Sequence, residues 1–133
     1  KIKAGDADAK QVIAAPVSQV LRYLKVPGLT GFTITSALPH MHMLGTTINT
    51  ALNGQSLLDI GRWQFGWQQT YYIKTPVKVS SSDLLTVECH FDNSYANQPM
   101  VGGVKQMPRD VTFGEGSGDE MCVSLLGVQI PRM

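Results

Sequence analysis

The residues best suited to chemistry in this chain are two histidines that stand two positions apart in the string LPHMHMLG, namely His40 and His42. On a β-strand, side chains at positions i and i+2 point to the same face. His40 and His42 would therefore project side by side, and two adjacent imidazoles form half of a metal site. A polar pair on a solvated strand face is the alternative, and the local spacing alone does not decide between the two.

A third candidate ligand lies about eighty positions further along, at Met121, next to Cys122. Neighbouring residues of a strand face opposite ways, so Met121 and Cys122 would lie on different faces of a sheet. A thioether is a soft ligand that favours Cu(I), and imidazole also suits copper. Two imidazoles and one thioether leave a fourth position open, which is unsuitable for a structural zinc site. The chain has six methionines, and a methionine in a strand is usually a core residue.

The two cysteines, Cys89 and Cys122, leave three alternatives open: reduced core residues, a disulfide, or metal ligands. Their spacing matches neither a C-x-x-C redox pair nor a zinc finger. A disulfide would indicate an oxidising compartment. His90, the remaining histidine, would point away from Cys89 and lie on the surface or partly buried.

Short alternating segments separated by turn residues predict an all-β protein, an antiparallel β-sandwich. In the segment 31–38, Phe32, Ile34 and Ser36 alternate with Thr33, Thr35 and Ala37, and Pro39 then suggests an edge or a bulge. Asn53-Gly54 between segments 46–52 and 56–60 predicts a hairpin, because both residues tolerate positive φ. In the segment 83–91, Leu85, Val87, Cys89 and Phe91 share one face. The aromatic cluster 63–67 is expected to serve in core or rim packing, and the irregular stretch 92–115 is expected to be functional or pinned at its ends.

We expect two regions, an N-terminal arm or edge segment at 1–30 and a copper-binding β-sandwich domain at 31–133. The segment 18–25 fits either two helical turns or an edge strand. Because the chain starts at Lys1, we expect a processed or trimmed product, which leaves open an N-terminal targeting segment or a whole domain outside the given sequence.

A net charge of +1 gives no electrostatic reason to expect nucleic acid or an anionic membrane as a partner. No apolar run approaches the roughly 20 residues needed to span a bilayer. The glycine run 114–118 is no phosphate loop, because no Lys-Ser/Thr follows it and it precedes a strand.

Four strings, in this order and at these separations, carry a resemblance to a known family: LPHMHMLG, LLDIGRWQFGWQQTYYI, LLTVECHFDNS and VTFGEGSGDEMC. Together they resemble the C-terminal domain of the type II, ascorbate-dependent copper monooxygenases, most closely the bacterial members. That family includes peptidylglycine α-hydroxylating monooxygenase and dopamine β-monooxygenase. The likeness runs from about Gly31 to Val128.

The resemblance implies that His40, His42 and Met121 are the ligands of one catalytic copper, which activates O2 to hydroxylate a C–H bond of a small-molecule substrate. It also implies a disulfide between Cys89 and Cys122, a jelly-roll-like β-sandwich and a secreted, periplasmic or extracellular location. The second electron would come from a three-histidine copper on a companion N-terminal domain, with ascorbate as the external reductant.

The chain departs from the family pattern in three ways. Only His90 remains once the pair is used, so the three-histidine copper cannot be built here. Positions that hold the substrate in the peptide-hydroxylating enzymes correspond to Leu38, Val123 and Leu125, which leaves a peptide carboxylate without an anchor. The second disulfide of the animal enzymes has no cysteines here.

The leading hypothesis is therefore the copper-binding catalytic domain of a monooxygenase, incomplete as an isolated chain. The alternative is a non-enzymatic periplasmic copper carrier or store, to which Met41, Met43, Met100 and Met107 could add thioethers. A carrier needs ligands that are accessible for transfer, whereas a monooxygenase needs a pocket beside the metal. A purely structural β-sandwich module would bind no copper.

Overall fold

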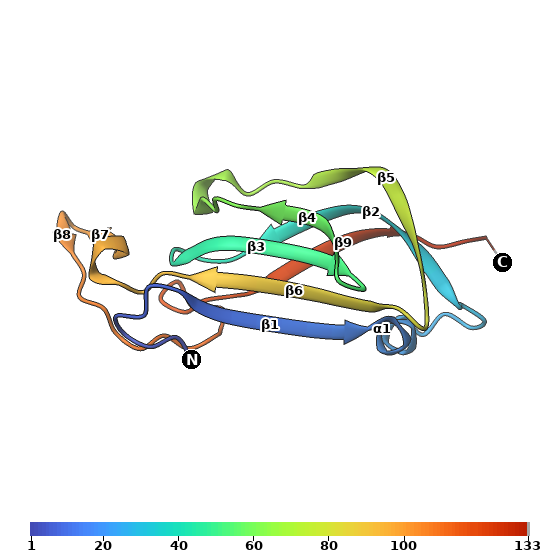
Figure 1. Cartoon of the computed structure of the whole chain (residues 1–133), viewed down its shortest axis with the longest axis horizontal. Coiled ribbons are helices and arrows are strands. Elements are labelled where there is room, and N and C mark those ends of the chain that lie inside the picture. Colours follow the sequence, from blue (N-terminus) through green and yellow to red (C-terminus); the bar gives the residue numbers. More distant parts are fainter. Residues whose placement is uncertain (133) are drawn as a thin grey trace.

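The computed structural model describes residues 1–132 and shows two antiparallel sheets packed face to face (Figure 1). One sheet has the strand order β1-β6-β3-β4 and the other has the order β5-β2-β9. The long strands are β1 (Ala9–Pro16), β2 (Gly31–His40), β3 (Gly45–Leu52), β4 (Gln55–Ile60), β5 (Tyr71–Ser80), β6 (Leu84–Phe91) and β9 (Val123–Gln129). The all-β, antiparallel sandwich predicted from the alternating segments is confirmed.

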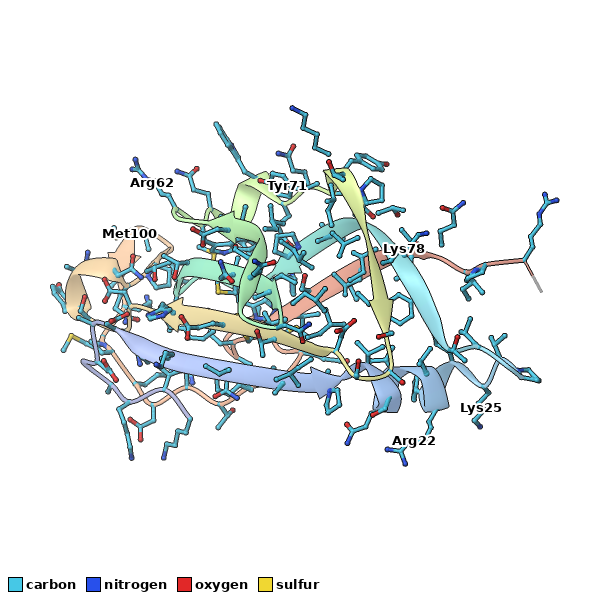
Figure 2. The ribbon with its side chains drawn as sticks, turned by 45° about the vertical axis from the view of Figure 1, so that its right-hand side comes forward. Arg22, Lys25, Arg62, Tyr71, Lys78 and Met100 are labelled. Carbon is cyan, nitrogen blue, oxygen red and sulfur yellow. A yellow bond between two sulfur atoms is a disulfide. The ribbon has the colours of Figure 1, made fainter. Side chains whose placement is uncertain are left out.

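The remaining elements are short and lie at the ends of the sandwich. They are α1 (Val17–Leu24), the 3-10 turns η1 (Phe65–Trp67) and η2 (Tyr95–Asn97), and the hairpin strands β7 (Met100–Val101) and β8 (Val104–Lys105). The β7–β8 hairpin lies at the end opposite α1 (Figure 1), and Figure 2 shows Met100 at that end and Arg22 and Lys25 at the other. No helix within residues 1–132 has the length and apolar character needed to cross a membrane.

The N-terminal residues are built into the sandwich. Strand β1 pairs with β6 along its whole length, from Ala9 opposite Phe91 to Pro16 opposite Leu84, and it forms the edge of its sheet. Ile2 is 2% exposed, and its N–H and C=O groups both bond to Val111. Residues 9–16 are thus an edge strand of the four-stranded sheet.

The segment 18–25, for which helix and strand were both open, is helical. Helix α1 places Leu21 and Leu24 against the core cluster that contains Val17, Phe32, Ile34, Val79 and Leu85. It ends at Lys25, which has a left-handed φ of 55°. The nearby Pro27 cannot donate an N–H group to a longer helix, which explains why the helix is short.

The predicted hairpin is confirmed, since β3 and β4 are adjacent antiparallel strands joined at Asn53 and Gly54. Their φ angles are 51° and 82°, the positive values that a two-residue hairpin turn requires. The Asn53 side chain also accepts the N–H of Leu84 at 2.8 Å, which ties the turn to the start of β6.

A bulge in β2 decides which way the histidines face. The pairing of β2 with both neighbours shifts between Ile34 and Ser36, so Thr35 is an extra residue. Phe32 and Ile34 are buried before the bulge, and Ala37, Pro39 and Met41 are buried after it. The predicted alternation is therefore wrong beyond Ile34, because one inserted residue exchanges the two faces.

Pro39 lies in the part of β2 that pairs with β9 but no longer with β5. The pairing of β2 with β5 ends at Ala37 opposite Tyr71, while the pairing with β9 continues to His40 opposite Val123. The missing N–H of Pro39 therefore interrupts no ladder on the β5 side. The local edge suggested by this proline is present, and the bulge lies four positions earlier.

The second core cluster lies at the end of the sandwich away from α1. Its buried members are Ile2, Met41, Leu44, Ile48, Trp63, Cys89, Phe91, Val111 and Cys122. Cys89 and Cys122 form a disulfide with their Cα atoms 5.8 Å apart, which joins β6 of one sheet to the start of β9 of the other. The disulfide implied by the family resemblance is present, and it settles the three alternatives that spacing left open.

Candidate metal centre

His40 is the last residue of β2, and His42 lies in the tight connection between β2 and β3. The centroids of the two imidazole rings are 5.1 Å apart, and their planes meet at 80°. Met41, between them, is fully buried and points into the core. The i, i+2 spacing thus places the two rings next to each other on the face opposite Met41.

Hydrogen bonds determine which nitrogen of each ring is free to bind a metal. Nδ1 of His42 lies 2.8 Å from the carbonyl oxygen of Asp119, which can only accept, so Nδ1 carries the proton. Nδ1 of His40 lies 2.5 Å from Oε1 of Gln68, whose Nε2 donates to the carbonyl of Phe65 at 3.0 Å. Both Nε2 atoms therefore carry a lone pair, which is the arrangement that metal-binding histidines adopt.

Aromatic residues close the site around His42, which is only 7% exposed. The indole N–H of Trp63 donates to the His42 carbonyl at 3.0 Å, and the Phe65 ring lies nearly perpendicular to the His42 ring, with 6.1 Å between centroids. Trp63 packs in the core and Phe65 at its rim, as the sequence predicted for this cluster. Trp67 is 78% exposed and takes no part in that packing.

Glu120 is a buried carboxylate, 1% exposed, that connects two distant segments. Its Oε1 accepts the N–H of His42 at 2.7 Å, and its Oε2 accepts the N–H of Leu44 at 2.7 Å. Burial raises the pKa of Glu120, and the backbone N–H groups bonded to it act in the opposite direction.

Met121 follows directly and is half-buried, and its own N–H donates to Oε1 of Glu120 at 3.3 Å. The next residue, Cys122, is 5% exposed and bonded to Cys89 in the core. His40 is opposite Val123, and an antiparallel register that continues beyond the strand ends would bring Met121 opposite His42.

No third His, Cys, Asp or Glu in residues 1–132 joins the two imidazoles in a metal-binding cluster. A third protein ligand would therefore be a group of another kind, and the thioether of Met121 has the softness that suits Cu(I). The residues present thus fit a soft copper ion with an open position better than a structural zinc ion.

His90 lies apart from the pair and points away from the buried Cys89, as predicted. Its Nδ1 lies 2.7 Å from Oδ1 of Asp8, and its Nε2 lies 3.2 Å from Oε2 of Glu88. Hydrogen bonding to Asp8 is the main cause that raises the pKa of His90, and burial opposes it. His90 has a structural role between β6 and the segment before β1.

The match to known proteins covers the whole of this site. Residues 22–127 match the family described as copper type II ascorbate-dependent monooxygenase, C-terminal domain. The chain belongs to this family. No curated protein matches the chain. The family assignment agrees with the resemblance found in the sequence.

Three residues that support the histidines were not identified from the sequence: Gln68, Asp119 and Glu120. Gln68 and Asp119 orient the two rings, and Glu120 holds the backbone of His42. Glu120 was visible only as the neighbour of Met121, which is a weak signal. No local pattern marks Gln68, which is 28 positions from the histidine that it contacts.

Proposed function

We propose that this monooxygenase C-terminal domain binds one copper ion through Nε2 of His40, Nε2 of His42 and the thioether of Met121. The observation that carries the proposal is the pair of adjacent rings whose Nδ1 atoms are both bonded to fixed oxygens. When bound, copper would supply the one-electron chemistry that lets O2 hydroxylate a substrate C–H bond.

The chain's own residues would orient and enclose the ion. Asp119 and Gln68 hold the rings, and Phe65 covers the edge of His42. The low exposure of His42, 7%, favours a catalytic centre over a carrier, which needs ligands accessible for transfer. Met41 is fully buried in the core, so it would offer no thioether to a carrier.

The substrate would meet an apolar surface beside His40. Leu38 is opposite Leu125 and His40 is opposite Val123, so these apolar side chains share one face of the sheet with His40. Leu125 is 60% exposed. Lys78, labelled in Figure 2, is opposite Thr33, roughly 20 Å from His40 along β2. We therefore expect a small substrate that offers an uncharged group to this surface rather than a peptide carboxylate.

Turnover would need a companion domain. The three histidines of this chain are the pair and His90, which is held by Asp8 and Glu88, so an electron-donor copper has no three-histidine site here. We propose that such a site lies on an N-terminal domain, with ascorbate as reductant, and that the disulfide reflects an oxidising location such as the periplasm or the extracellular space.

The metal site is tested by titration with Cu(I) under anaerobic conditions. We expect one tight site in the wild type, and its loss in both His42→Ala and Met121→Ala. The matched control is Met107→Ala, because Met107 is 74% exposed and outside the proposed ligand set. Unchanged binding in both ligand variants would refute the site.

A second experiment separates an enzyme from a carrier. With the companion domain present, ascorbate-dependent O2 consumption and a hydroxylated product are expected, and Met121→Ala should abolish both. Tight binding of Cu(I) without ascorbate-dependent O2 consumption would favour the carrier.

A further inference from the structure

We propose that Glu120 is a positioning residue of the metal centre, which fixes the segments of His42 and Met121 before the ion binds and supplies a negative charge beside it. This inference rests on the proposed copper site. Glu120 itself is not a ligand in this proposal, since both its oxygens are already occupied by backbone groups.

The contacts of Glu120 explain how it would position the site. Its carboxylate accepts the N–H groups of His42 and Leu44, which lie 78 and 76 positions away in the sequence, and that of its neighbour Met121. The Glu120 side chain therefore binds the main chain at His42 and Leu44, in the connection between β2 and β3, and also the main chain at Met121.

The segment 119–121 would thus contribute to the site in three ways. The Asp119 carbonyl orients the His42 ring, the Glu120 carboxylate holds the His42 backbone, and Met121 offers the thioether. A shift of this segment would move the imidazole and the sulfur together. The backbone and the ring of His42 are therefore both held by the segment 119–121.

The charge of Glu120 needs a separate explanation. Burying a carboxylate is unfavourable unless it is well hydrogen-bonded or paired. Within residues 1–132 Glu120 takes part in no salt bridge with Lys, Arg or His, and its partners are neutral N–H groups. A cation bound to the adjacent imidazoles would be attracted strongly at this low dielectric.

The test compares Glu120→Gln with Glu115→Gln. Each variant removes one carboxylate from the same loop region, but Glu115 is exposed. In Glu120→Gln, the amide NH2 must face a backbone N–H group, so one of the hydrogen bonds to His42 and Leu44 is lost. We expect the affinity for Cu(I), measured by anaerobic competition with a chromophoric chelator, to fall by about 10- to 100-fold. Glu115→Gln should bind like the wild type.

The reduction potential of the bound copper gives a readout that a purely structural role would not change. Loss of a nearby negative charge destabilises Cu(II) more than Cu(I), so the potential should rise in Glu120→Gln. Glu120→Asp retains the charge but is one methylene shorter, so its affinity should fall while its potential stays near the wild-type value. The electron paramagnetic resonance spectrum of the Cu(II) form should change in both variants.

The outcomes separate this inference from the proposed function. If the wild type binds no Cu(I), the proposed function fails. If the wild type binds, and Glu120→Gln lowers the melting temperature but leaves affinity and potential unchanged, only the role of Glu120 is refuted. If Glu120→Gln does not fold, Glu120→Asp decides, and wild-type affinity in that variant would refute the positioning role.

Discussion

Each imidazole of the histidine pair is fixed by a hydrogen bond from Nδ1 to an oxygen, the amide of Gln68 for His40 and the carbonyl of Asp119 for His42. These bonds select one tautomer and limit rotation of the ring, so a metal ion meets Nε2 lone pairs that already point in defined directions. The oxygen of Gln68 is itself held in place, because the other end of its amide donates to Phe65. Affinity for the proposed ion would therefore depend on residues that do not touch it.

Replacing Gln68 by Ala tests this dependence at the residue scale. The side chain is exposed, so the free energy of unfolding of the metal-free protein should change little, whereas the affinity for Cu(I) should fall by about 10-fold or more. Gln69→Ala is the control for the anaerobic titration, since Gln69 is an exposed neighbour that makes no hydrogen bond to either histidine within residues 1–132. Equal affinities in the two variants would show that the His40 ring needs no such support.

At the scale of single elements, the bulge at Thr35 and the turn at Asn53-Gly54 determine register. The bulge turns the second half of β2 over, so that Ala37, Pro39 and Met41 enter the core and the histidines lie on the opposite face. The Thr35 hydroxyl donates to the carbonyl of Gly127 at 3.2 Å, which holds the bulge against β9. At Gly127 a Cβ would lie within 2.1 Å of Ser36 Oγ, so glycine permits the close approach.

The hairpin turn gives a sharp test of element-scale energetics. Gly54 has a φ of 82°, and the space that a methyl group would occupy there is open, so Gly54→Ala should lower the free energy of unfolding by about 1 kcal/mol through backbone strain alone. Gly61→Ala is the control, since Gly61 also has open space and does not have a positive φ, and it should be nearly neutral. Urea unfolding measures both, and equal effects would contradict the strain argument.

At the scale of the whole molecule, the proposed metal centre lies where the two sheets are joined covalently. The Cys89–Cys122 disulfide connects β6 of the four-stranded sheet to the residue after Met121. The same end of the sandwich contains the core cluster of Met41, Trp63 and Phe91. Packing, the disulfide and the Glu120 hydrogen bonds thus stabilise the same region, which also carries the candidate ligands.

Removing the disulfide with the pair Cys89→Ala and Cys122→Ala should lower the free energy of unfolding by about 3–4 kcal/mol, because the closed loop spans 33 positions. Urea denaturation of the oxidised wild type and the double variant measures this loss. We also expect weaker Cu(I) binding in the double variant, because residue 122, next to Met121, is no longer anchored to β6 by the disulfide. Wild-type stability in the variant would show that packing alone fixes this junction.

The sequence predicted those features that depend on neighbours within a few positions. A period of two placed His40 beside His42, and Asn53-Gly54 identified the hairpin, because positive φ is a property of the residues themselves. The alternation of residues 85–91 likewise identified β6 and the opposite directions of Cys89 and His90. The resemblance to the monooxygenase family added the disulfide and the jelly-roll-like form of the sandwich as expectations. The disulfide is present in the structure, and the family match confirms the family.

Only the tertiary structure decided the features that depend on distant contacts. Which face the histidines occupy depends on the bulge in β2, and no residue type in that segment predicts a bulge. Residues 9–16 form a strand because they pair with β6 along its free side. Gln68, Asp119 and Glu120 reach the histidines across 28 to 78 positions, so no local pattern could reveal them. The period of a sequence segment predicts which of its residues share a face, whereas the tertiary structure determines which distant residues contact that face.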